Sequence, residues 1–273
     1  MTNALTTQPG AQVPTDPAQM EDYFRQYAQA YAEAEPSTGQ SISVNNGVMT
    51  VGDQAIPGNQ FAAIILDAVH INAFYGAPYN PQVILPPTCY AIGRTEMEMA
   101  PHPDMNKDLS FFQPQAERCA ACPQNVFGSA AQGSGKACKN KRRMLLVVAG
   151  TYTPQGQLQP ITDISYYETT PLLTLNVAPT SAKNWGRFVR ETAGSYNRPP
   201  FGMIARVYLY PHEKHGKEAI GFDTLAPVPD EWVATIVKRQ QEAQNQIGEG
   251  YEAPSQEARG GQQPMQQRGG GFR

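Results

Sequence analysis

Four cysteines constrain the fold of this chain more than any other feature. Cys119 and Cys122 form a Cys-x-x-Cys pair, Cys138 follows after a short loop, and Cys89 lies at a distance upstream. A Cys-x-x-Cys turn places two thiolates along one edge of a tetrahedron, and two further thiolates complete a closed structural zinc site. The spacing therefore predicts one four-thiolate site that uses every cysteine of the chain, with zinc as the expected metal.

Other chemistries remain open for the same four thiols. They can also hold an iron–sulfur cluster, pair as disulfides or act as a redox Cys-x-x-Cys. His102 could replace one cysteine as a ligand. A closed four-thiolate site leaves no position for a water molecule, so we do not expect a catalytic metal.

The cysteines lie in an irregular segment at about residues 86–143, which is rich in Pro, Gly, Gln and Asn. A loop of this length inside a compact domain needs its own source of order, which a bound metal would supply. Sequence typical of strands covers residues 42–51, with a turn at Asn45-Asn46-Gly47, and residues 61–75, 143–153, 164–177, 201–210 and 218–225. Helical patterns cover residues 22–33, 182–194 and 229–243.

This order of elements predicts a β-rich α+β fold, namely an OB-like barrel with an inserted zinc-binding loop and flanking helices. We expect the domain at residues 19–244. The polar residues 1–18 and the Gly-, Gln- and Arg-rich tail at 245–273 are expected to be disordered. No Gly-rich loop stands between a strand and a helix, so a dinucleotide-binding or P-loop fold is not expected.

Positive charge is concentrated beside the last cysteine. The chain as a whole has 21 Lys and Arg against 24 Asp and Glu, so any preference for a polyanion must be local. Cations on a metal-ordered loop are typical of phosphate contact, whereas a solvated charged loop is the alternative interpretation. The cations around Cys138 are Lys136, Lys139, Lys141, Arg142 and Arg143.

Cations and aromatic residues also alternate in the second half of the chain. Aromatic faces with cations between them suit single-stranded nucleic acid, because every base offers a ring face and every link a charge. Core packing is the alternative for each ring, so only a subset can contact bases. The candidates are Tyr166, Tyr167, Lys183, Trp185, Arg187, Arg190, Arg206, Tyr208 and Tyr210.

The segment from Cys119 to Arg143, CAACPQNVFGSAAQGSGKACKNKRR, resembles a motif of phage-encoded replication and recombination proteins, CxxCPxNxFGS followed by GKxCKNxRR. The downstream APTSAKNWGRFVRE is also similar to those proteins. The resemblance implies a zinc-stabilised, OB-like single-stranded DNA-binding protein, with the four cysteines as ligands and the cations after Cys138 as the basic end. The acidic tail of familiar single-strand binding proteins is replaced by Gly, Gln and Arg, which puts recruitment of partners by that route in doubt.

The sequence therefore favours a largely sequence-independent single-stranded DNA-binding protein that acts in phage DNA replication or recombination, in contact with the proteins of those processes. A zinc-containing protein-interaction or structural protein, such as a virion component or a transcription-machinery binder, is the alternative. We expect no enzyme, because no H-E-x-x-H, GxSxG or P-loop motif is present. A nuclease could still assemble its carboxylates from Asp67, Asp163 and Glu168.

The sequence predicts a cytoplasmic location, in a bacterial host if the chain is phage-encoded. The first residues lack a basic region followed by an apolar region, and no apolar run is long enough to span a bilayer. We therefore expect no membrane partner. No pattern indicates an oligomeric state or a choice between DNA and RNA.

Overall fold

A computed structural model describes Asp16 and residues 41–77, 85–212 and 217–253 of the 273-residue chain. The helix predicted at 22–33 lies outside these residues. So does most of each segment that the sequence predicts to be disordered. No helix within the described residues is long and apolar enough to cross a membrane.

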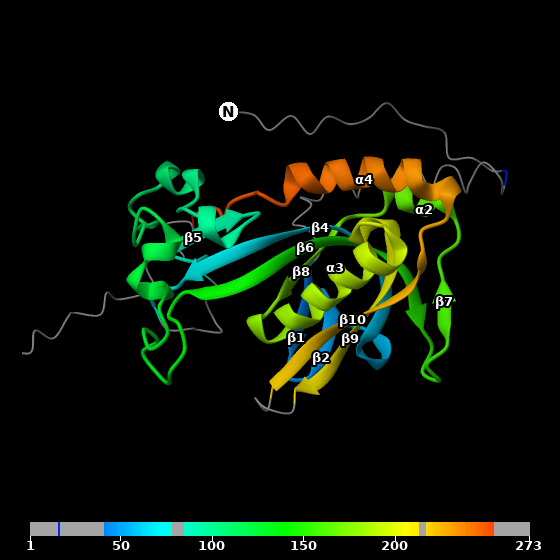
Figure 1. The fold of residues 1–273 in the computed structure, drawn as a ribbon, viewed down its shortest axis with the longest axis horizontal. Helices are drawn as coiled ribbons and strands as arrows, with labels where there is room; N and C mark the ends of the chain where they lie inside the picture. Colours follow the sequence, from blue (N-terminus) through cyan, green and yellow to red (C-terminus); the bar gives the residue numbers. More distant parts are fainter. Residues whose placement is uncertain (1–15, 17–40, 78–84, 213–216, 254–273) are drawn as a thin grey trace, which may run out of the picture. The chain divides into compact units, whose positions relative to one another are not determined.

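The fold is a mixed α+β protein dominated by a curled β-sheet that forms a half-barrel (Figure 1). The sheet has the strand order β10-β9-β4-β6-β8-β1-β2-β3, with β5 added to β4 and β7 added to β6. Only β1 and β8 pair in parallel. The strands are β1 (Ser41–Asn45), β2 (Val48–Val51), β3 (Gln54–Ala55), β4 (Gln60–Phe74), β5 (Cys89–Gly93), β6 (Lys139–Tyr152), β7 (Leu158–Pro160), β8 (Leu173–Val177), β9 (Met203–His212) and β10 (Lys217–Pro227).

Three α-helices accompany the sheet in the described residues: α2 (Ile164–Thr169), α3 (Ala182–Tyr196) and α4 (Val233–Gln246). Short 3-10 turns join the elements. They are η1 (Pro57–Asn59), η2 (Glu96–Glu98), η3 (Pro103–Lys107), η4 (Cys119–Ala121), η5 (Pro123–Asn125), η6 (Pro179–Ser181), η7 (Pro200–Gly202) and η8 (Asp230–Trp232).

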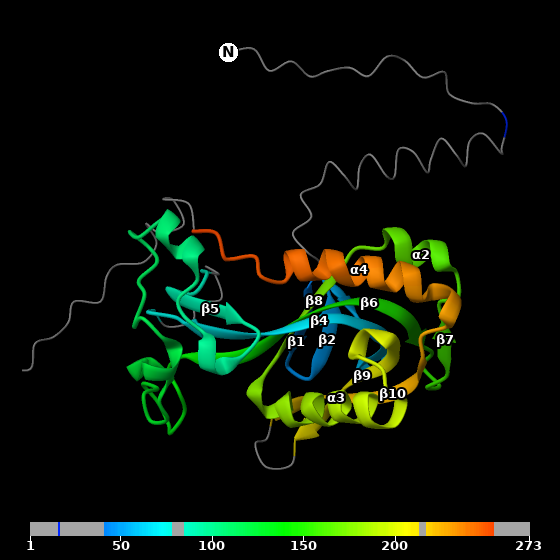
Figure 2. The ribbon, with the colours of Figure 1, turned by 45° about the horizontal axis from the view of Figure 1, so that its top comes forward.

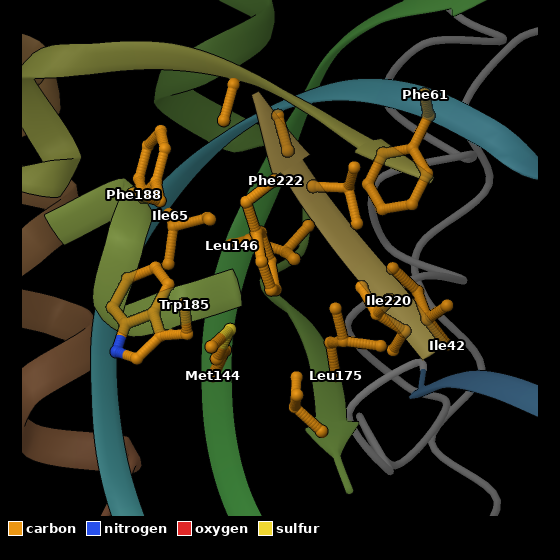
Figure 3. Packing of buried hydrophobic residues seen from close by; sticks show 14 of the residues in the cluster. Ile42, Phe61, Ile65, Met144, Leu146, Leu175, Trp185, Phe188, Ile220 and Phe222 are labelled. Atoms are coloured by element: carbon orange, nitrogen blue, oxygen red, sulfur yellow. The ribbon is translucent and has the colours of Figure 1, made fainter. Parts of the chain in front are cut away.

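Both faces of β4 are buried, which explains its long apolar sequence. Helices α3 and α4 lie on opposite sides of β4 and β6 (Figures 1 and 2). Alternate residues of β4, such as Ile64 and Ile65, therefore belong to two different apolar clusters. A strand covered on both faces reads as a continuous hydrophobic run instead of alternating with polar residues. On the α3 side, Trp185 and Phe188 pack beside Ile65 (Figure 3), with ring centroids 5.6 Å apart.

The sequence prediction fails for the first half of residues 164–177. These residues were expected to form strands, but Ile164–Thr169 is the helix α2 and only Leu173–Val177 is a strand. Asp163 starts the helix, because its carboxylate accepts a hydrogen bond from the backbone N–H of Ser165 at 2.9 Å. An N-cap aspartate accepts a hydrogen bond from an otherwise unpaired N–H of the first turn and so stabilises the helix. This stabilisation outweighs the preference of Ile164 and its neighbours for a strand.

Residues 85–138 form a separate lobe at the far end of β4 and β6, which we call the thiol lobe because all four cysteines belong to it (Figure 2). Its apolar cluster is small and centres on Tyr90, Met105 and Phe112. The segment that follows α4 also reaches this lobe, since the rings of Tyr251 and Tyr90 meet edge to face at 4.9 Å. The predicted tail from residue 245 thus begins as the end of α4 and continues as a segment that packs on the lobe.

Candidate functional site

The four cysteines line one small cavity. Cys89 opens β5, Cys119 and Cys122 bracket η4, and Cys138 directly precedes β6. All four line the same cavity of about 20 Å³. This volume accommodates about one water-sized sphere, so the space between the thiols suits a single ion and no larger ligand.

Backbone hydrogen bonds position three of the four thiols. The N–H of Cys122 donates to the carbonyl of Cys119 at 3.3 Å, which closes the Cys-x-x-Cys turn. The N–H of Cys138 donates to the carbonyl of Gln124 at 2.8 Å and brings the third thiol back to this turn. Cys89 comes from another direction, because it stands opposite Phe74 in the β4–β5 pairing. The arrangement thus joins a local turn to a distant strand.

Three asparagines support the cavity wall. The side-chain amide of Asn140 donates to the side-chain carbonyls of Asn72 at 2.5 Å and Asn125 at 3.0 Å. Asn125 in turn donates to the backbone carbonyl of Cys119 at 2.9 Å. Asn72, buried in β4, also hydrogen-bonds to the thiol of Cys119. These amides fix the cysteine turn to strands β4 and β6 without filling the space between the thiols.

The thiols are close enough to influence one another electrostatically. Burial, together with the neighbouring Cys119, Cys122 and Cys89, raises the pKa of the Cys138 thiol to about 12, against a smaller lowering by Lys136. Burial also raises the pKa of Cys119 and of Cys89. A cluster of buried thiols that disfavours its own ionisation is one that a divalent cation would strongly stabilise in the thiolate form.

The thiols line the cavity without being drawn together around one point. All four cysteines are free thiols. Across the described ranges, no three or more Cys, His, Asp and Glu side chains form a ready-made metal-binding group. His102 is turned to other partners: its Nε2 lies 3.0 Å from the carbonyl of Gly248 and its Nδ1 accepts from the N–H of Asp104 at 3.2 Å. His102 is therefore not a candidate ligand in this arrangement, and the four cysteines are the thiols that line the cavity.

The five cations around Cys138 divide into two groups. Lys139 and Lys141 are exposed and Lys136 is half-buried, and within the described residues none of them lies within 4 Å of a carboxylate. The two arginines have structural partners. Arg142 donates to Nε2 of His70 at 3.0 Å. Arg143 donates to the carbonyls of Ile247 and Glu249 at 3.2 and 2.8 Å.

The interpretation of Arg143 as a phosphate contact is therefore corrected. Its guanidinium also stands 5.4 Å from the ring centroid of Tyr251, so the residue holds the chain that leaves α4 against the thiol lobe. The sequence could not distinguish it from Lys141 because both belong to one run of cations. The two residues are two positions apart in β6 and share one face of the strand, so strand alternation does not separate them either.

Helix α3 presents fewer free cations than the sequence predicts. Lys183 and Arg190 are exposed, but Arg187 donates to the carbonyl of Phe222 at 2.8 Å and to Asp223 at 3.2 Å. Asn184 donates to the backbone carbonyl of Ile220 at 2.8 Å, and the hydroxyl of Ser181 accepts from the N–H of Ile220 at 2.8 Å. These side chains form hydrogen bonds with backbone groups along the outer edge of β10. Without such bonds, the edge strand would be open to pairing with another strand.

Two of the predicted stacking residues are core residues, and these predictions are wrong. Trp185 is 7 % exposed and packs edge-on to Phe222 at 5.5 Å. Tyr167 is fully buried beneath α4, and its hydroxyl donates to the carbonyl of Ile161 at 2.7 Å. Neighbouring Tyr166 is half-buried against Tyr167. Burial supplies each ring with apolar contacts and leaves no free face for a base.

The outer face of β9 carries a partly exposed set of side chains that matches the prediction better. Arg206 lies over the rings of Tyr152 and Tyr208, at 5.9 and 4.7 Å from their centroids. Tyr208 and Tyr210 are neighbours at 5.8 Å. The ring of Tyr208 lies directly over Gly221, where a side chain would collide with it. The guanidinium and the two tyrosines thus form a platform beside β10.

Two of the three candidate nuclease carboxylates have structural partners. Asp67 forms an ion pair with Arg94, and Asp163 caps α2. Glu168 belongs to α2, where its backbone carbonyl lies 3.5 Å from Arg239. Sequence reasoning also missed a residue, because Phe127 is 78 % exposed on the thiol lobe. The available signal was a lone aromatic in a polar, Gly-rich segment without apolar neighbours at strand or helix spacing.

Three features of the described residues therefore bear on function. They are the cavity lined by the four thiols, the lysines near Cys138 (Lys136, Lys139 and Lys141), and the platform of Arg206, Tyr208 and Tyr210. The chain matches no family model, no curated protein and no solved structure.

Proposed function

We propose that this protein binds single-stranded DNA without sequence preference and that the four cysteines of its thiol lobe hold one zinc ion. The observation that carries the proposal is the position of Lys136, Lys139 and Lys141. All three lie next to Cys138 in the sequence, and within the described residues none of them is within 4 Å of a carboxylate, in a chain whose net charge is −3. Free cations in an otherwise acidic protein favour a local polyanion site.

The thiol set favours zinc over a catalytic metal. Four thiolates at about 2.3 Å complete the tetrahedral shell of Zn²⁺ and leave no position for substrate, so bound zinc would stabilise the fold of the lobe. Such a role fits a lobe with a small apolar cluster. Lys136 lies where it would offset the negative charge of a four-thiolate site. An iron–sulfur cluster is distinguished by its visible absorption and iron content.

Single strands are favoured over duplex because cations and ring faces occur together. Lysines can follow phosphates, and exposed rings or guanidinium planes can stack on unpaired bases. The Arg206 platform offers such surfaces on the half-barrel. In this proposal the half-barrel is OB-like and the thiol lobe is its inserted zinc-binding loop. Function in phage DNA replication or recombination, in the cytoplasm of a bacterial host and beside the proteins of those processes, belongs to the same proposal.

The test is fluorescence anisotropy of labelled single-stranded and duplex oligonucleotides with the metal-loaded protein at several salt concentrations. We expect salt-sensitive binding that favours single strands. The double variant Lys139→Ala, Lys141→Ala should reduce the slope of log K against log salt by about 1.4, since each phosphate contact on a single strand contributes about 0.7. The control Lys238→Ala removes an exposed cation of α4 that is not among the candidate nucleic-acid-binding residues, and it should leave the slope unchanged.

No binding at low salt would overturn the proposal. A protein-interaction role is then the second candidate, because the thiol lobe also exposes apolar side chains: Met97 is 75 % and Leu109 is 60 % exposed. Exposed apolar side chains grouped on one lobe are typical of a protein interface.

A further inference from the structure

The loop between Cys122 and Cys138 carries the most exposed large apolar side chain of the described residues. Phe127 is 78 % exposed, and its neighbour Val126 is 57 % exposed. Burying a phenylalanine side chain stabilises a folded protein by about 1.5–3 kcal/mol. Phe127 does not provide this stabilisation, because it is exposed. A single exposed ring is ordinary on a protein surface, so further observations must decide whether it has a role.

The loop that carries Phe127 is tightly hydrogen-bonded. The N–H of Gly128 donates to the carbonyls of Ser134 and Gly135 at 3.1 and 3.0 Å. The hydroxyl of Ser129 accepts from the N–H of Ala137 at 2.9 Å and lies 2.6 Å from the carbonyl of Val126. Gly128 has φ +88°, a conformation that favours glycine and allows this tight turn. The ring is thus held outward by a defined loop that begins and ends at thiols.

One lysine lies beside the exposed ring, and a second lysine is hydrogen-bonded to the backbone of the first. Nζ of Lys136 lies 5.2 Å from the ring centroid of Phe127 and 3.2 Å from Oδ1 of Asn125, which fixes it in place. Nζ of Lys139 donates to the backbone carbonyl of Lys136 at 3.0 Å. A cation near an exposed ring gives a surface on which a flat aromatic group and an anionic group can be bound side by side.

We propose that Phe127 stacks on an unpaired base while Lys136 and Lys139 contact the adjoining phosphates, so that this loop makes the protein selective for single strands. The inference rests on the proposed function and assigns strand selectivity to one residue. A base in a duplex keeps both faces covered by its neighbours, and only an unpaired base can offer a face to Phe127.

The loop and the Arg206 platform lie at opposite ends of the central strand pair. Ala73 of β4 pairs with Lys139, whereas Gln60 pairs with Tyr208 of β9. The thirteen residue steps from Gln60 to Ala73 span roughly 40 Å of strand at about 3.3 Å per residue. A stacked strand that rises about 3.4 Å per nucleotide along its axis would need about twelve nucleotides to cover that length. The Phe127 site therefore acts alone on a short oligonucleotide.

The experiment compares Phe127→Ala with Phe127→Trp and with Leu109→Ala, by anisotropy of a labelled hexanucleotide and of a short duplex. Leu109 is an exposed apolar residue of the same lobe and serves as the matched control. We expect Phe127→Ala to weaken single-strand binding about 5- to 150-fold, the range for loss of one base–aromatic stack. The salt slope should stay unchanged, because no charge is removed.

Phe127→Trp should keep the affinity, and its fluorescence should be quenched by single strands and unaffected by duplex. Leu109→Ala should bind as the wild-type protein does. Unchanged affinity of Phe127→Ala, or equal losses on single strands and duplex, would overturn the inference while Lys139→Ala, Lys141→Ala still tests the proposed function. If the wild-type protein binds no oligonucleotide, the proposed function itself fails, and the inference fails with it.

Discussion

The two ends of strand β4 are stabilised in different ways. At the half-barrel end, residues of β4 are buried on both faces beneath α3 and α4, and large side chains such as Phe188 and Phe222 fill the interior. At the other end, β4 enters a lobe whose apolar cluster has only Tyr90, Met105 and Phe112 as fully buried members. The comparison teaches that one continuous strand can join a region with a large apolar interior to a lobe with a small apolar cluster and four thiols around one cavity.

The largest expected effect is on the thiol lobe alone. Cys122→Ser removes one of four predicted ligands, and structural zinc sites contribute folding free energy of the order of 10 kcal/mol in small domains. We expect the purified variant to contain little zinc and to be cleaved by protease within residues 85–138. The wild-type protein should contain one zinc ion and resist cleavage there. Full resistance of the metal-free variant would show that the lobe does not need the ion.

The complementary change affects the half-barrel. Phe188 is fully buried in the α3 cluster, so Phe188→Ala should lower the free energy of unfolding by about 3–5 kcal/mol. Zinc content should stay at the wild-type value, because no ligand or lobe contact changes. Chemical denaturation together with metal analysis measures both quantities. If Phe188→Ala lost zinc in proportion to its loss of stability, the half-barrel and the thiol lobe would not be stabilised separately.

A smaller effect is expected at the joint between the regions. Arg143→Ala removes two hydrogen bonds from a charged donor to the carbonyls of Ile247 and Glu249. We expect the free energy of unfolding to fall by about 1–3 kcal/mol and amide exchange in residues 247–253 to become faster. The control Lys141→Ala removes a nearby exposed cation and should leave both unchanged. Equal effects of the two substitutions would show that Arg143 contributes no more to stability than an exposed surface cation.

The smallest expected effect is a pH dependence at the base of the lobe. Burial lowers the pKa of His70, and Arg142 lowers it further, while Glu96 acts in the opposite direction. The unfolded chain therefore takes up a proton as the pH falls through 6.5 and the folded protein does so only at lower pH. Stability should decrease across this window, and His70→Gln should lessen the decrease. The same slope in both proteins would exclude His70 as its source.

Much of the half-barrel could be predicted from local pattern. The turn at Asn46-Gly47 and the long apolar run of β4 appear in the structure where the sequence places them. Residues 164–169 could not be predicted, because one side-chain cap at Asp163 decides between helix and strand. The count and spacing of the four cysteines predicted a single site, and in the structure all four line one cavity, while metal binding there stays a prediction.

The aromatic residues were harder to assign from sequence. Trp185 and Tyr208 each stand near cations in the chain, yet Trp185 is buried in the core and Tyr208 lies partly exposed over Gly221. Exposure depends on which face of a strand or helix meets another element, and a single sequence does not contain that information.

Hydrogen exchange of the full-length protein, with and without a zinc chelator, tests the difference between the two regions most directly. The account predicts that chelation removes protection from residues 85–138 and leaves β9 and the sheet-buried part of β4 as slow to exchange as before. Uniform loss of protection across both regions, or no change in the lobe after the metal is removed, would contradict it.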